Sequence, residues 1–133
     1  MQIFSFVNQK GGCGKTTTAV NLAGALSAQG RRVLLIDLDP QAHATLGLGC
    51  DPGEGPTTLD VLSGTSTLSE AVVPVAGGID LVPGALSLGE FEERAEHSLR
   101  PEQALTHALR ELDKEYDEVL LDCPPRADGV LTA

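Results

Sequence analysis

A glycine-rich segment between a strand pattern and a helix pattern limits the folds open to this chain. The segment reads Lys10-Gly11-Gly12-Cys13-Gly14-Lys15-Thr16-Thr17. Before it, residues 2–7 (QIFSFV) alternate in polarity and are rich in β-forming side chains. After it, residues 15–29 carry apolar residues at helical spacing, with Gly30 just beyond the end. A strand, a glycine turn and a helix in this order are typical of the first unit of a parallel α/β sheet.

The rest of the chain continues the alternation of strands and helices. Residues 32–37 (RVLLID) and 118–122 (EVLLD) are continuous apolar runs, as expected of parallel strands that are buried on both faces. A shorter strand is predicted for residues 79–82, a loop for 47–56, and helices for 57–62, 67–73, 86–96 and 101–113. The pattern therefore predicts a single α/β domain over residues 1–133, with a parallel sheet and helices on both faces.

The glycine-rich segment has the composition of a phosphate-binding loop. Its glycines allow successive backbone N–H groups to point at phosphate oxygens, and the helix that follows adds the positive end of its dipole. In this interpretation Lys15 contacts the β- and γ-phosphates, and the Thr16 hydroxyl binds Mg²⁺. The usual pattern G-x-x-x-x-G-K-[ST] would need glycine at position 9, where this chain has Gln9, so the segment is a variant with a second lysine, Lys10. A glycine turn that only caps a helix is disfavoured, because K-G-G-x-G-K-T arises by chance at roughly 10⁻⁷ per position.

Aspartates follow two of the predicted strands. Asp37 ends the strand at 32–37 and Asp39 follows two residues later, whereas Asp122 ends the strand at 118–122. Ligands of open parallel sheets bind beyond the carboxyl ends of the strands, so these carboxylates should lie beside the glycine-rich loop. There they can bind Mg²⁺ or its waters and orient a water for attack on the γ-phosphate. The alternative interpretation is that they cap a turn and a strand end.

Composition argues against several other classes of protein. The formal net charge is −10 with nine Lys and Arg residues, which does not favour a nucleic-acid-binding face. Three scattered cysteines favour neither a disulfide framework nor a zinc site. The apolar runs are too short to cross a bilayer, and no signal segment opens the chain. We therefore expect a cytoplasmic protein that does not act at a membrane.

Three segments resemble the deviant Walker A, Walker A′ and Walker B motifs of ParA/Soj partitioning ATPases. They are NQKGGCGKTTTAVNLA (8–23), RRVLLIDLDPQAHATLGLG (31–49) and YDEVLLDCPP (116–125). The resemblance covers nearly the whole chain and is densest in the first 50 residues. It implies a P-loop ATPase that binds ATP and Mg²⁺, dimerises with ATP and hydrolyses it. Such ATPases bind DNA non-specifically and are stimulated by a ParB-type partner to move plasmids or chromosomes.

The resemblance also assigns roles to individual residues. Lys10 would reach the ATP of the other subunit, and Asp39 would be the carboxylate needed for hydrolysis. The nucleotide would be bound by Gly11, Gly12, Cys13, Gly14, Lys15, Thr16 and Thr17, with Lys15 also acting in catalysis and Thr17 at the α-phosphate. Thr16 would bind Mg²⁺ directly and Asp122 would bind it through water. Asp37 is a further Mg²⁺ candidate because of its position at a strand end.

The chain departs from the resemblance in three respects. Members of this family are usually about twice as long, so we expect the domain to be truncated at its C-terminal end. Arg126-Ala127-Asp128-Gly129 stand where a serine usually follows the two prolines. The acidic charge means that DNA binding is expected of a longer parent protein and not of this chain.

Three alternatives accompany the partitioning hypothesis. A MinD-like positioning ATPase would need a C-terminal amphipathic helix for a membrane, and a nitrogenase-reductase-like electron carrier would need cysteines placed to share an iron–sulfur cluster. Neither feature is found in the sequence. The third alternative is a catalytically weak fragment that binds nucleotide or only a partner.

Overall fold

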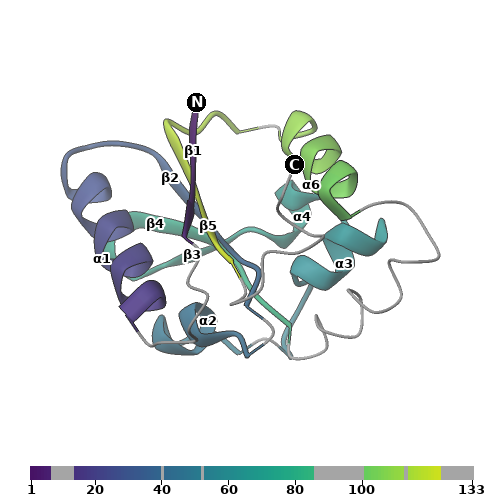
Figure 1. Ribbon diagram of the computed structural model, residues 1–133, viewed down its shortest axis with the longest axis horizontal. Coiled ribbons are helices and arrows are strands. Elements are labelled where there is room, and N and C mark those ends of the chain that lie inside the picture. Colours follow the sequence, from purple (N-terminus) through teal and green to yellow (C-terminus); the bar gives the residue numbers. More distant parts are fainter. Residues whose placement is uncertain (7–13, 40, 52, 86–100, 113, 124–133) are drawn as a thin grey trace.

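A five-stranded sheet organises the molecule (Figure 1). The computed structural model describes residues 1–6, 14–39, 41–51, 53–85, 101–112 and 114–123. The strand order is β1-β5-β2-β4-β3. The strands are β1 (Gln2–Phe6), β2 (Val33–Asp37), β3 (Val73–Val75), β4 (Ile79–Val82) and β5 (Glu118–Asp122). Neighbouring strands run parallel except at the edge, where β3 is antiparallel to β4.

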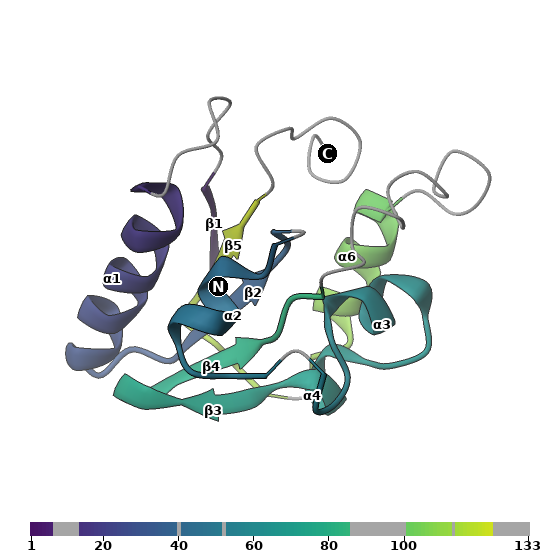
Figure 2. The same ribbon diagram turned by 90° about the horizontal axis from the view of Figure 1, so that it is seen from below.

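Helices cover both faces of this sheet (Figure 2). They are α1 (Gly14–Ala28), α2 (His43–Gly47), α3 (Thr58–Ser63), α4 (Leu68–Ala71) and α6 (Pro101–Arg110), with a 3-10 turn η1 at Ala76–Gly78. Both views place α1 on one side of the sheet and α3 and α6 together on the other. No helix within the described ranges is both long and apolar enough to cross a bilayer.

The side chains of β2 show how one strand joins two cores. Leu34 and Ile36 pack into the cluster under α3 and α6, whereas Val33 and Leu35 pack into the cluster under α1. Successive side chains of a strand point to opposite faces, so a continuous apolar run fills both layers at once. The whole of β2 is buried, as is the whole of β5 beside it.

Most of the predicted elements are confirmed. The strands expected at 2–7, 32–37, 79–82 and 118–122 are β1, β2, β4 and β5, and the helices at 15–29, 57–62 and 101–113 are α1, α3 and α6 within a few residues. The predicted helix over 86–96 lies outside the described residues.

One predicted helix was wrong in its extent, and one short helix was not predicted. The helix expected over 67–73 ends at Ala71, and Val73–Val75 form β3 against β4. Pro74 lacks the N–H that a central strand needs, which is why this segment can pair only at an edge of a sheet. The loop expected over 47–56 is confirmed at residues 48–51 and 53–56. Helix α2 before it was not predicted, because its N-cap Ala42, with a φ of 53°, gives no capping signal in the sequence.

Candidate functional site

The carboxyl ends of β5 and β2 meet the first turn of α1. Asp122 and Asp37 are register partners at the ends of these two strands, so their Cα atoms lie side by side. The Thr16 hydroxyl donates a hydrogen bond of 2.9 Å to Asp122 Oδ2, across 106 positions of sequence. The strand ends predicted to form a site are therefore joined to the helix that follows the glycine-rich loop.

Three carboxylates come together at this edge of the sheet. One oxygen from each of Asp37, Asp39 and Asp122 lies within 4.8 Å of the others. All three side chains are buried. Buried carboxylates repel one another unless a cation or hydrogen-bond donors offset their charge. The donors around Asp37 and Asp39 can be named.

Asp37 is bound by three donors. Its Oδ1 accepts from the Asp39 N–H at 3.0 Å, and its Oδ2 accepts from the Thr45 N–H at 2.9 Å and the Thr45 hydroxyl at 2.6 Å. Burial raises the pKa of Asp37 to about 6, since the hydrogen bonds from Thr45 and Asp39 offset only part of the lost hydration and the charge of Asp122 adds to the shift.

The turn after β4 closes over Asp37. The Gly84 N–H donates to the Thr45 hydroxyl at 2.8 Å. A Cβ atom at position 84 would lie 2.9 Å from the carboxylate carbon of Asp37, closer than side chains tolerate. The Thr58 hydroxyl donates to the carbonyl of Asp37 at 2.8 Å, which ties α3 to the end of β2. Position 84 therefore accommodates only glycine without rearrangement.

Asp39 is held by the segment that follows it. Its Oδ1 accepts from the Gln41 N–H at 3.0 Å, and its Oδ2 lies 2.7 Å from His43 Nδ1 and 3.4 Å from the His43 N–H. The side chain of Asp39 is 5% exposed, whereas that of His43 is 56% exposed. Asp39 thus lies at the boundary between the carboxylate cluster and the solvent.

The oxygen donors at this edge fit a hard divalent cation. A hydroxyl and carboxylates are the ligands that Mg²⁺ prefers, and no sulfur or imidazole nitrogen takes part in the described cluster. Thr16 and Asp122 are already within hydrogen-bonding distance of each other, so both oxygens could face one ion. Asp37 has three of about four carboxylate lone-pair positions occupied by donors, which leaves it little capacity for a metal.

The described residues include part of the predicted nucleotide loop. Gly14 and Lys15 form the start of α1, and Thr17 lies in its first turn. Lys10, Gly11, Gly12 and Cys13 lie outside the described residues, as do Arg126–Gly129. Sequence reasoning missed Thr45, Thr58, Gly84 and His43. Of these, only Gly84 had a signal, since Pro83-Gly84 directly follows a predicted strand.

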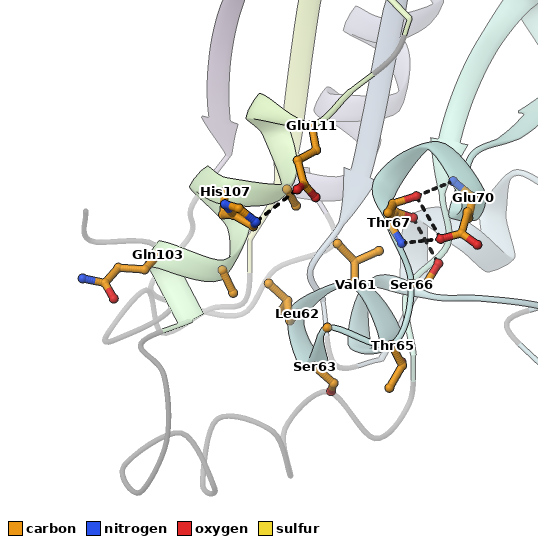
Figure 3. Close-up of a pocket in the computed structure, with 13 residues that line it drawn as sticks. Val61, Leu62, Ser63, Thr65, Ser66, Thr67, Glu70, Gln103, His107 and Glu111 are labelled. Carbon is orange, nitrogen blue, oxygen red and sulfur yellow. Dashed lines mark hydrogen bonds and ion pairs between the residues drawn. The ribbon is translucent and has the colours of Figure 1, made fainter.

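A separate cavity lies away from these residues. It has a volume of about 450 Å³ and opens between α3, the turn at residues 63–67 and α6 (Figure 3). Its polar side chains bond one another, as in the pairs Thr67–Glu70 and His107–Glu111. No residue of the predicted nucleotide site lines it, so the chemistry of the chain is better sought at the carboxylate cluster.

Comparison with known proteins identifies relatives of the chain. The chain is 42% identical over 129 residues to the chromosome partitioning protein ParA of Caulobacter vibrioides and 36% identical over 133 residues to the sporulation initiation inhibitor Soj of Bacillus subtilis. These matches cover 94% and 98% of this chain but 48% and 52% of the relatives. The chain therefore spans about half the length of the curated relatives it matches.

A solved structure shows the same partial coverage. Cobyrinic acid a,c-diamide synthase from Mycobacterium smegmatis, with a bound ATP analogue and magnesium, superposes with a TM-score of 0.89 at 43% identity. The alignment covers 99% of this chain and 54% of the synthase. A family model described as an AAA domain, AAA_31, matches residues 1–133. With a P-loop ATPase fold and ParA- and Soj-like relatives, this chain belongs to the AAA_31 family.

Proposed function

We propose that this chain is the nucleotide-binding part of an ATP-hydrolysing dimerisation switch like those of ParA and Soj. The observation that carries the proposal is the contact between Thr16 and Asp122 beside the buried carboxylates of Asp37 and Asp39. It joins the helix after the glycine-rich loop to the strand end at which the sequence predicts a Mg²⁺-binding carboxylate. The ParA and Soj names of the relatives and the ATP analogue and magnesium of the solved structure support this interpretation.

Each site residue then has a chemical task. Lys15 offsets the charge of the transferring phosphate, and the backbone N–H groups at residues 11–17 bind the phosphate oxygens. Thr16 and Asp122 would hold the metal. When bound, Mg²⁺ supplies positive charge that stabilises the charge developing on the phosphate. Asp39 orients the attacking water, and Asp37 mainly fixes the turn between β2 and α2 through Thr45.

The second lysine extends the proposal to a dimer. Lys10 would reach the ATP of the other subunit and act as a charge supplied only in the assembled state, in the manner of an arginine finger. ATP would then control association. The cargo is plasmid or chromosomal DNA, by analogy with the ParA relative, and a ParB-like protein would be the partner.

DNA binding is proposed for a longer protein and not for these residues. Phosphate contacts require Lys and Arg, and this chain has nine against nineteen Asp and Glu. The nucleoid and the surrounding cytoplasm are the proposed location of that longer protein. A fragment that binds ATP weakly is the alternative, because the chain spans about half of its relatives.

Calorimetry with two lysine variants tests the nucleotide site. We expect Lys15→Ala to abolish measurable binding of ATP and Mg²⁺. Loss of one charge-assisted contact with the phosphate reduces the free energy of binding by roughly 2–3 kcal/mol. The matched control is Lys114→Ala, which removes the same charge from a lysine that donates a hydrogen bond to Asp80 of β4. Equal affinity in the wild type and the Lys15 variant would refute the proposed site. Loss of binding in both variants would point to damage of the fold.

A further inference from the structure

His43 and Asp39 are in direct contact at the edge of the carboxylate cluster. His43 Nδ1 lies 2.7 Å from Asp39 Oδ2, and the backbone N–H of His43 approaches the same oxygen at 3.4 Å. The other oxygen, Oδ1, accepts from the Gln41 N–H at 3.0 Å. Each oxygen of Asp39 therefore has its own donor, which fixes the plane of the carboxylate.

The left-handed backbone at Ala42 holds the imidazole in place. Ala42 is fully buried and has φ 53° and ψ 39°, in the left-handed region. A residue with a Cβ adopts this conformation at a cost of about 1 kcal/mol or more, so the surroundings must enforce it. The Ala42 N–H donates to the Asp39 carbonyl at 2.9 Å, and His43 then begins α2. This turn directs the imidazole back toward the carboxylate.

The imidazole of His43 and the carboxylate cluster lie on different sides of Asp39, so the imidazole can fix the orientation of the Asp39 carboxylate. One oxygen of Asp39 lies within 4.8 Å of oxygens of Asp37 and Asp122. The His43 side chain is more than half exposed, so it lies toward solvent from the buried carboxylate. A donor in that place leaves the remaining lone pairs of Asp39 available for a water while it prevents the carboxylate from turning.

We propose that His43 is a positioning residue for Asp39. In its neutral form the imidazole donates its Nδ1–H to Asp39 Oδ2 and holds the carboxylate in the orientation needed to align the attacking water. This inference rests on the proposed function, in which Asp39 acts in ATP hydrolysis. It does not require His43 to touch the nucleotide or the metal.

Steady-state ATP hydrolysis by three variants of the full chain tests the role. We expect His43→Ala to lower kcat roughly 10-fold, as is typical when the partner of a reacting group is lost, with KM changed by less than about 2-fold. His43→Asn retains an N–H donor and should recover most of kcat. The control is His107→Ala, since His107 pairs with Glu111 in the same i,i+4 spacing on α6 at 3.2 Å. A His43→Ala variant with wild-type kcat would overturn the inference.

Nitrogen NMR of the imidazoles tests the contact between His43 and Asp39 independently of ATP hydrolysis. In the neutral imidazole of the wild type we expect His43 to carry its proton on Nδ1. In Asp39→Ala the proton should move to Nε2, the commoner tautomer, while the signals of His107 stay unchanged. An Nε2–H tautomer of His43 in the wild type would overturn the inference even in an active protein. A wild type with the Nδ1–H tautomer but no hydrolysis would instead refute the proposed function.

Discussion

At the scale of single residues, Asp37 shows how a buried carboxylate can serve the backbone. Its two oxygens accept from the Asp39 N–H and from the N–H and hydroxyl of Thr45, so it joins the end of β2 to α2. Gly84 completes this arrangement by donating to the Thr45 hydroxyl. Residues outside the predicted nucleotide-binding set, such as Thr45 and Gly84, can therefore determine where Asp39 lies.

Thr45→Val tests this role of the hydroxyl. Valine has nearly the same shape, but it leaves the buried Asp37 oxygen short of one donor and the Gly84 N–H without its acceptor. We expect a loss of about 3 kcal/mol in the free energy of unfolding, since buried groups left unpaired lose their hydration without compensation. Urea unfolding measures the difference, with Thr65→Val at an exposed threonine as the control. A change below about 1 kcal/mol would show that water replaces the hydroxyl.

The free energy of unfolding should depend on pH through the titration of Asp37. Its pKa in the folded chain is about 6, above the ordinary value of 3.8. Between these values the folded state binds the proton more tightly than the unfolded state, so the contribution of Asp37 to stability falls as the pH rises from 3.8 to 6 and then stays low. The total change is about 3 kcal/mol.

Comparison with Asp37→Asn isolates this contribution. We expect the stability of the wild type relative to the variant to decrease between pH 4 and pH 6 and to be constant above about pH 7. Urea unfolding without nucleotide or Mg²⁺ measures it at each pH. Parallel curves for the two proteins would show that Asp37 titrates normally.

At the scale of elements, the pattern of apolar residues predicted the strands that are buried in the sheet. The runs RVLLID and EVLLD were predicted to be strands covered on both faces, and β2 and β5 are buried throughout. The same reasoning placed Asp37 and Asp122 at one edge of the sheet, where they are register partners. Apolar pattern and strand ends were sufficient for these features because both follow from local sequence.

The features that were missed depend on distant contacts. The segment Val73–Val75 forms β3 only because β4 offers it an antiparallel partner, and its proline argues against a strand when read alone. Helix α2 is preceded by a left-handed alanine at its N-cap, a conformation that the propensity of alanine does not favour. Thr45 forms hydrogen bonds with Asp37, eight residues away in the sequence, and with Gly84, 39 residues away. Only the packed structure brings these groups together.

At the scale of the whole molecule, the two edges of the sheet differ in protection. The edge strand β3 is short and contains Pro74, which opposes further pairing. The other edge strand, β1, has five residues with neither charge nor proline. Its Gln2 N–H and Phe6 carbonyl bond the segment of β5, and no described strand pairs with its outer side. Ile3 and Phe4 are 47% and 41% exposed.

This asymmetry predicts that the chain associates through β1. An unprotected apolar edge offers unpaired N–H and C=O groups to a strand of another molecule. We expect the wild type to form concentration-dependent oligomers in sedimentation-velocity runs without nucleotide.

Ile3→Lys should shift the distribution toward monomer, because a charge on the edge strand must be desolvated when a second strand pairs with it. Val73→Lys is the matched control on the protected edge and should leave the distribution unchanged. Equal effects of the two lysines would show that net charge drives the change, and a monomeric wild type would show that β1 does not recruit another chain.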